Sequence, residues 1–246
     1  MLYGRNAVRE ALRGRRKLDR LFIAEGVRED NRLQPIVALA RERGVAIDRV
    51  PRELLDDATH GANHQGIALE AETYAYAPFE NLIETPGTVL VLDHVQDPQN
   101  LGTLLRAAEA AGVAGVVIPQ NRAADVTPAV VNASSGAVEH LGIAQVPNIA
   151  RALQQLKQSG RWVAGLDAGP GAVDLFSADI PQPAVLVVGS EGTGLAPHVR
   201  KTCDLLLALP MRGRVESLNA ATAGSIALYE LVRRGAKGDE RGTSEE

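Results

Sequence analysis

The stretch "VLDHVQDPQNLGTLLRAAEAAG", residues 91–112, decides the fold class. An apolar run ends at Asp93, a polar loop follows, and a helical pattern begins near Asn100. Pro98 restricts the backbone, and Asn100 is suited to N-cap the helix. One helical face is formed by Leu101, Leu104, Leu105 and Ala108. Arg106 points away from that face, so the stretch predicts a strand-to-helix turn with polar groups gathered in its loop.

The same alternation of apolar runs and helical segments extends over the chain from residue 88 onward. Unbroken apolar runs, separated mostly by helical segments, are "TVLVLD", "VAGVVIP", "LGIAQVP", "RWVAGL", "AVLVVG" and "LLLALP". Such runs indicate strands of a mainly parallel sheet with helices on both faces. Ligands of these sheets bind beyond the carboxyl ends of the strands. The loop at 93–100 is therefore expected at a ligand site.

The pattern divides the chain into two domains. Residues 1–72 predict a small α/β unit in which short helices and strands alternate. Residues 73–87 hold two prolines and clustered aromatic residues and are expected to be a linker. The second α/β domain is expected at 88–235, and the polar tail at 236–246 is expected to be disordered.

Composition and charge narrow the class of protein. The 246 residues carry a net charge of −4 and a single cysteine, Cys203, so neither an internal disulfide nor a cysteine metal cluster is possible. The five histidines lack metal-ligand spacing, and no metal is expected. No long apolar segment or cleavable leader is visible, which predicts a cytoplasmic protein.

A basic segment opens the chain. Residues 1–20 hold seven Lys and Arg against two acidic residues. This surface could meet an anion such as RNA, and a solvated helix face is the alternative. Candidate RNA contacts are Arg5, Arg9, Arg15, Arg16 and Arg20.

A glycine loop follows the strand pattern at residues 185–197, "VLVVGSEGTGLAP". Gly189, Gly192 and Gly194 let backbone N–H groups approach a ligand closely. Their spacing is G-x-x-G-x-G, which is not the dinucleotide fingerprint. Glu191 would repel phosphate, so the loop favours a ligand with hydroxyl or ammonium groups.

A third loop precedes the last helix, in "LALPMRGRVESLNAATAGSIALYELVRRG", residues 207–235. Ser217 is expected to open the helix, with Ser217 and Asn219 as candidate caps. Arg212 and Arg214 are further candidate RNA contacts. Hydrolase chemistry is disfavoured because no nucleophile-elbow sequence surrounds any serine and Cys203 has no recognisable partner.

Together the three loops resemble the signature motifs of the SpoU (TrmH-type) RNA ribose 2′-O-methyltransferases. The first reads "LDHVQDPQNLGTLLRAAEAAG", the second "LVVGSEGTGL" and the third "LPMRGRVESLNAATAGSIALYE". The segments "LYGRNAVREAL" and "HGANHQGIAL" are typical of the branch that methylates a guanosine of 23S ribosomal RNA. The N-terminal part resembles the family's substrate-binding domain, which is L30e-like.

The resemblance implies a fold, a cofactor and a site. It implies a catalytic domain with a deep trefoil knot, S-adenosylmethionine as cofactor, RNA as substrate and a homodimer formed through the catalytic domain. Implied catalytic residues are Asn100, Arg106, Glu191, Ser217 and Asn219. Implied cofactor-binding residues are Gly189, Glu191, Gly192, Leu209, Met211, Ser217 and Leu218.

Three alternatives remain at this point. Transfer RNA could replace ribosomal RNA, although minimal transfer RNA enzymes tend to lack the N-terminal unit. A catalytically silent RNA-binding protein is disfavoured by the complete polar set. A nucleotide-dependent oxidoreductase is disfavoured by the glycine spacing. In the favoured mechanism, Arg106 stabilises charge on the 2′-oxygen, because arginine stays protonated and is a poor base.

Overall fold

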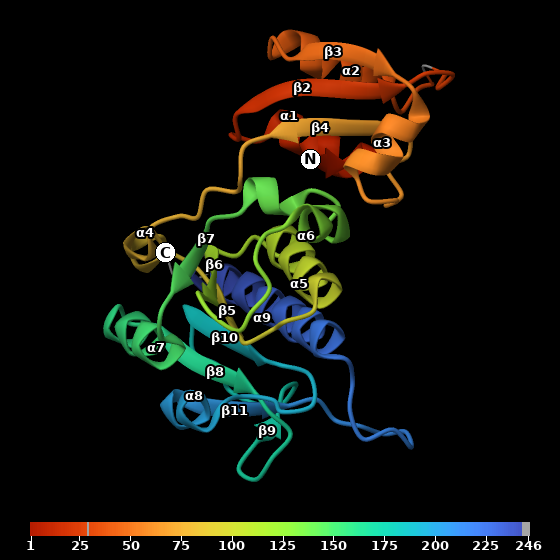
Figure 1. The fold of residues 1–246 in the computed structure, drawn as a ribbon. Coiled ribbons are helices and arrows are strands. Elements are labelled where there is room, and N and C mark those ends of the chain that lie inside the picture. The colour runs from red at the N-terminus through yellow and green to blue at the C-terminus, as the bar shows by residue number, and fades with distance from the viewer. Residues whose placement is uncertain (29, 243–246) are drawn as a thin grey trace. The chain divides into compact units, whose positions relative to one another are not determined.

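The computed structural model describes residues 1–28 and 30–242 and divides the chain into two compact units (Figure 1). Unit 1 contains Met1–Ala75 and Asp125–His140, and unit 2 contains Tyr76–Ala124 and the chain from Leu141 onward. The chain therefore leaves unit 2 after Ala124 and returns to it at Leu141. The sequence pattern predicts one contiguous domain over 88–235, whereas the structure assigns residues 125–140 to unit 1.

Unit 1 is built on a four-stranded mixed sheet in the order β1-β4-β2-β3. Strand β2 pairs parallel with β3 and antiparallel with β4, and β1 pairs antiparallel with β4. Its elements are β1 (Leu2–Tyr3), α1 (Arg5–Arg13), β2 (Leu18–Ala24), α2 (Gln34–Glu42), β3 (Ala46–Val50), α3 (Arg52–Ala58), β4 (Ile67–Ala71), α6 (Pro128–Ala133) and η1 (Ala137–His140).

Segment 125–140 is held in unit 1 by polar contacts and close packing. Asn132 Nδ2 donates to the Tyr3 carbonyl at 3.0 Å, and His140 Nε2 lies 2.9 Å from Glu10 Oε2. At Gly136 (φ +88°), an added Cβ would lie 2.6 Å from the Glu10 Cβ. Glycine is therefore required there by both backbone and space.

A buried ion pair also joins the two parts of unit 1. Arg16 and Glu139 approach to 2.8 Å with side chains only 8% and 3% exposed. The Arg16 guanidinium lies 5.4 Å from the centre of the Tyr74 ring. Burial raises the pKa of the Glu139 carboxyl, although Arg16 opposes this shift. Arg16 thus has a structural role, and its burial contradicts its prediction as an RNA contact.

Unit 2 is a seven-stranded sheet in the order β7-β6-β5-β10-β8-β11-β9, and its strand pairs are parallel. This confirms the parallel sheet predicted from the apolar runs. Its elements are α4 (Phe79–Glu84), β5 (Val89–Asp93), α5 (Pro98–Ala110), β6 (Gly115–Pro119), β7 (Ile143–Val146), α7 (Ile149–Gln158), β8 (Trp162–Leu166), β9 (Val173–Asp174), β10 (Ala184–Gly189), α8 (Pro197–Thr202), β11 (Leu205–Ala208) and α9 (Ala220–Gly242).

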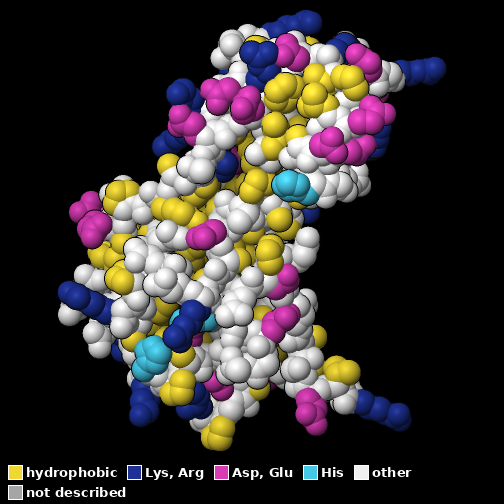
Figure 2. Space-filling view, in the orientation of Figure 1, with side chains coloured by type: hydrophobic (Ala, Val, Ile, Leu, Met, Phe, Trp, Pro, Cys, Tyr) yellow, Lys and Arg dark blue, Asp and Glu magenta, His cyan; other side chains and the backbone are white. Residues whose placement is uncertain are grey.

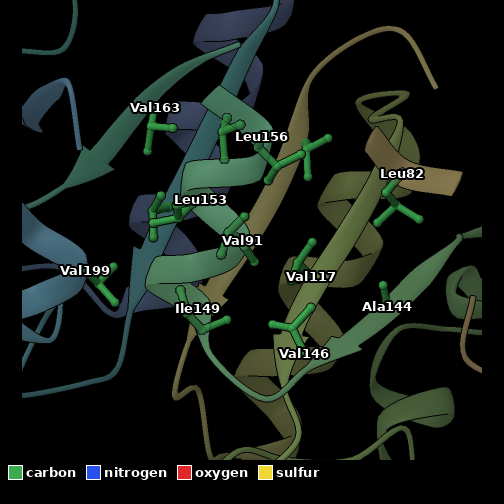
Figure 3. Packing of buried hydrophobic residues seen from close by; sticks show 14 of the residues in the cluster. Leu82, Val91, Val117, Ala144, Val146, Ile149, Leu153, Leu156, Val163 and Val199 are labelled. Carbon is green, nitrogen blue, oxygen red and sulfur yellow. The ribbon is translucent and has the colours of Figure 1, made fainter. Parts of the chain in front are cut away.

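Both faces of this sheet are buried. One face packs against α7 and α8 through alternate strand residues, as Figure 3 shows for Val91, Val117 and Val163 around Leu153 and Leu156. Helices α5 and α9 pack together, and α9 also packs on β10. An added Cβ at Gly224 would lie 2.6 Å from the Leu104 side chain, so a small residue sets how closely α9 approaches α5.

The expected linker contains structure. Helix α4 lies within 73–87, and its Leu82 is buried in the core of unit 2. The Arg161 guanidinium donates to the carbonyls of Ile83 at 2.9 Å and Gly87 at 3.3 Å, and to that of Thr85. One buried cation therefore satisfies the backbone acceptors at the end of α4.

The end of the chain also differs from expectation. Disorder was predicted for 236–246, but α9 continues to Gly242, and residues 243–246 lie outside the described part. None of the described helices is both long and apolar enough to span a membrane. The knot implied by the family resemblance stays a prediction.

We predict that Arg16→Met strongly destabilises unit 1. The substitution leaves Glu139 buried without its cation, and breaking a buried pair costs about 3 kcal/mol. Native-state hydrogen exchange of the β2 and β4 amides measures the loss. Arg13→Met is the control, because Arg13 pairs with Glu10 at the surface and such pairs contribute less than about 1 kcal/mol. Equal losses in the two variants would contradict the structural role of Arg16.

Candidate active site

A pocket of about 580 Å³ lies at the carboxyl ends of β8, β10 and β11. We call it the glycine-loop pocket, because residues 189–194 form one of its walls and residues 216–220 another. Every residue that the sequence assigned to cofactor binding lines it, namely Gly189, Glu191, Gly192, Leu209, Met211, Ser217 and Leu218. The structure thus brings together residues from two motifs in one cavity.

The glycine loop is a tight hairpin whose conformation depends on its glycines. Ser190 and Gly194 exchange backbone hydrogen bonds of 3.2 and 3.0 Å, and Gly192 and Gly194 have φ of +79° and +64°. An added Cβ at Gly189 would lie 2.3 Å from the Gly194 carbonyl carbon. Only glycine fits at 189, so the loop turns back sharply at the end of β10.

Asn219 joins all three motifs. Its Nδ2 donates to Asn100 Oδ1 at 2.9 Å and also to Glu191 Oε1. Its Oδ1 accepts from the backbone N–H groups of Ala221 at 2.9 Å and Thr222 at 3.1 Å, so the side chain caps α9. We call Asn100, Glu191 and Asn219 the amide cluster.

Two helix starts differ from the sequence predictions. Asp97 is the N-cap of α5, since its Oδ2 accepts from the Asn100 N–H at 3.0 Å and Pro98 occupies the first turn. Asn100 is buried inside that turn, where its side chain is available to the amide cluster. Helix α9 begins at Ala220 after Asn219, and Ser217 lies in the preceding loop.

Asp93 is a positioning residue that the sequence did not single out for this role. Its side chain is 1% exposed, and its Oδ2 accepts from the Ala196 N–H at 2.7 Å. Its Oδ1 lies 2.6 Å from His94 Nδ1. The first motif is therefore fastened to the chain that follows the glycine loop. In the sequence, the feature that could have identified Asp93 is a carboxylate at the end of a fully apolar strand.

The charged residues that line the glycine-loop pocket determine which sign of ligand charge it favours. Among the described residues that line it are three carboxylates, on Asp167, Glu191 and Glu216, and no Lys, Arg or His. Asp167 is partly neutralised by Arg200 at 3.2 Å, and Asn219 donates to Glu191. A cationic ligand is favoured there over an anionic one.

Arg106 lies apart from the amide cluster within one chain. It is exposed on α5 and is not among the residues that line the pocket. It follows Asn100 by six positions, a rise of about 9 Å along the helix. The prediction that its side chain points away from the packed stripe is confirmed.

The other cations predicted to contact RNA are exposed or, at Arg5 and Arg9, half-buried. Arg15, Arg212 and Arg214 are exposed. Acidic neighbours pair with the remaining three, as Arg5 with Asp30, Arg9 with Glu10 and Arg20 with Asp48.

Cys203 is not a nucleophile. Burial raises the pKa of its thiol to about 12, and the nearby Asp204 carboxylate adds to the shift. The thiol therefore stays protonated at neutral pH. No group of three or more His, Cys, Asp or Glu that could hold a metal occurs among the described residues.

Family models match both parts of the chain. A model described as the SpoU rRNA Methylase family matches residues 87–229, and one described as RNA 2′-O ribose methyltransferase substrate binding matches residues 1–77. A Bacillus subtilis protein named as a TrmH family tRNA/rRNA methyltransferase is 40% identical over 237 residues, covering 94% of each chain. A Synechocystis tRNA/rRNA methyltransferase is 41% identical, and the match covers 95% of this chain but 62% of that protein.

Solved structures give a similar result. An AdoMet-bound rRNA methyltransferase from Sinorhizobium meliloti superimposes with a TM-score of 0.78 at 28% identity, covering 95% of this chain and 86% of that one. A structure described as concerning 2-OH methylation of C/U34 on tRNA gives a TM-score of 0.55 at 28% identity. That match covers 63% of this chain and 99% of the other.

We predict that Asn219→Ala destabilises the start of α9. The variant removes the cap and leaves the buried Asn100 amide without its partner, a loss of about 2 kcal/mol. Hydrogen exchange at Thr222 and Ala223 measures it. Ser225→Ala is the control, because Ser225 Oγ donates only to the Ala221 carbonyl within α9. The bridging role of Asn219 is wrong if both variants exchange at the same rate.

Proposed function

This chain belongs to the SpoU rRNA methylase family and is an RNA methyltransferase that uses S-adenosylmethionine, and from this premise we propose that it methylates a ribose 2′-hydroxyl of 23S ribosomal RNA, at a guanosine. The match of residues 1–77 to a ribose 2′-O substrate-binding model supports the position on the sugar. Coverage supports ribosomal RNA: the rRNA methyltransferase matches 95% of this chain, whereas the tRNA-related structure matches 63%.

We propose the glycine-loop pocket as the cofactor site. S-adenosylmethionine supplies an activated methyl group on a cationic sulfonium. The three carboxylates of the pocket suit that charge, and the missing Cβ at Gly189 lets the backbone approach the ligand closely. Backbone groups of Gly189, Leu209 and Leu218 would hold the cofactor, with Glu191, Gly192, Met211 and Ser217 beside them.

The remaining residues act on the attacking hydroxyl. Arg106 would donate to the 2′-oxygen and stabilise negative charge as the proton leaves. Asn100 and Asn219 would fix the ribose against the glycine loop, since the amide cluster already joins these elements. Ser217 lies in the same wall and would position the cofactor. Most of the rate enhancement would come from orientation and electrostatics.

A homodimer would bring Arg106 to the site. Helix α9 exposes Ile226, Tyr229 and Val232, three residues apart, beside α5, which carries Arg106. A second copy would cover this stripe in a two-fold interface, in which each subunit offers the same surface. The Arg106 of one subunit would then complete the pocket of its partner.

RNA would be held by the exposed cations Arg15, Arg20, Arg212 and Arg214 and by the half-buried Arg5 and Arg9. Figure 2 shows acidic and basic side chains interleaved over unit 1, so phosphate must compete with local ion pairs there. Affinity should therefore fall steeply as salt rises. Transfer RNA is the second candidate substrate, because the curated relatives are named for both RNA classes.

Methyl transfer from labelled S-adenosylmethionine to unmodified 23S ribosomal RNA tests the proposal. We expect a single ribose that resists alkaline cleavage with wild type, and a loss of at least about 100-fold in rate with Arg106→Ala, whose charge stabilisation is removed. Arg13→Ala, which removes an exposed cation outside the proposed RNA set, should keep the rate. If only transfer RNA is labelled, transfer RNA and not ribosomal RNA is the substrate. Labelling of bases would contradict ribose methylation.

Mixed dimers test the partner's arginine. Arg106→Ala and Asn219→Ala chains, each inactive alone, should recover roughly one quarter of wild-type activity when mixed, because half the dimers are mixed and each has one intact site. Native mass spectrometry confirms the mixing. Mixed dimers without recovered activity would show that Arg106 acts within its own chain.

A further inference from the structure

A second and larger pocket lies at the same edge of the unit 2 sheet. It has a volume of about 890 Å³ and is formed by the chain that follows β5, β6, β7 and β10. We call it the histidine pocket. The polar side chains that line it include Asp93, His94, Asn121, Arg122, Asn148 and His198. Pockets of this size hold nucleotide-sized ligands.

The glycine loop is the wall between the two pockets. Ser190, Thr193 and Gly194 line both of them. The Ser190 and Thr193 hydroxyls lie 2.6 Å apart, and this hydrogen bond across the loop stabilises its conformation. A ligand in the histidine pocket therefore lies one loop away from the proposed cofactor site.

The two pockets differ in charge. Arg122, His94 and His198 give the histidine pocket its basic groups, and Figure 2 shows histidine side chains beside a Lys or Arg side chain on unit 2. Its one carboxylate, Asp93, is buried and bonded to His94 and to the Ala196 N–H. The histidine pocket thus suits an anion, whereas the glycine-loop pocket suits a cation.

Two strained residues mark this pocket. In the described part of unit 2, the non-glycine residues with φ in the left-handed region are His94 (+62°) and Arg122 (+58°), and both line it. Their loops are tied together by Gln96 Nε2, which donates to the Arg122 carbonyl at 3.4 Å, and by the Ala124 N–H, which donates to the Val95 carbonyl at 3.0 Å. Strain of this kind collects at ligand sites.

We propose that the histidine pocket receives the RNA nucleotide whose ribose is methylated, an inference that rests on the proposed function. The base, turned out of its stack, would enter between Asn121 and Asn148, whose amide groups can hydrogen-bond its edge. Arg122 would bind the adjoining phosphate. His94, whose Nδ1 is engaged with Asp93, offers Nε2 to the nucleotide. The ribose would then lie against the glycine loop, facing the methyl donor.

Two substitutions test the pocket while preserving the backbone. Arg122→Gly removes the side chain at a φ that glycine adopts freely. His94→Asn retains a residue that tolerates this φ and keeps a donor for Asp93. Lys201→Ala is the control, because Lys201 is an exposed cation on α8 outside the lining of both pockets.

Kinetics with 23S ribosomal RNA and calorimetry with S-adenosylmethionine give the readouts. Each pocket variant should lower kcat/KM for RNA at least about tenfold, as expected for a charge-assisted contact, and leave the Kd for the cofactor within about twofold. Arg122→Gly should also reduce the slope of log affinity against log salt by about one. Lys201→Ala should change neither kinetic constant.

Direct binding separates this proposal from the proposed function. Guanosine 5′-monophosphate, added to wild type loaded with S-adenosylhomocysteine, should shift the NMR resonances of the His94 and His198 rings and leave those of His60 in place. Absence of shifts, or unchanged RNA kinetics in both pocket variants, overturns the proposal. If the shifts occur but wild type transfers no methyl to RNA, the histidine pocket is a nucleotide-binding site and the proposed function fails.

Discussion

The site depends on the hydrogen bonds of one side chain. Asn219 caps α9 with its oxygen and uses its amide nitrogen to join Asn100 of α5 to Glu191 of the glycine loop. These three residues are separated by up to 119 positions in the chain. Because Asn100 is buried, leaving its amide unpaired would cost free energy. The cluster therefore fixes the positions of the three motifs relative to one another.

The glycine loop divides the carboxyl-end edge of the unit 2 sheet into two chemically distinct sites. Its sharp return at Gly189 leaves a carboxylate-lined pocket beyond β8 and β11 and a basic pocket beyond β5, β6 and β7. Asp93, at the end of β5, stabilises the position of the glycine loop, since its carboxylate accepts from the Ala196 N–H just after that loop. Methyl transfer to RNA brings a cationic methyl donor next to a polyanionic substrate, and this division of charge favours such a pair of ligands.

The sequence predicted what is encoded locally. Unbroken apolar runs were enough to predict the parallel sheet. The seven residues that the family resemblance implies for cofactor binding line one pocket. The cap of α5 was assigned to Asn100 although Pro98 favours the first helical position, which points to Asp97. Segment 125–140 could not be assigned to unit 1, because Val130 and Val131 suit any core and their partners lie far away in the chain. The sequence likewise suggests that Arg16 is a surface charge, because its partner Glu139 lies far away in the chain. In the structure the two form a buried ion pair.

A crystal structure of the protein with S-adenosylhomocysteine and a short 23S ribosomal RNA fragment tests the central claim most directly. We expect the cofactor's sulfur in the glycine-loop pocket, the target ribose against the amide cluster, and the target base in the histidine pocket. A cofactor bound in the histidine pocket, or a target nucleotide that reaches the sulfur without entering it, would contradict the division of the sheet edge into two sites.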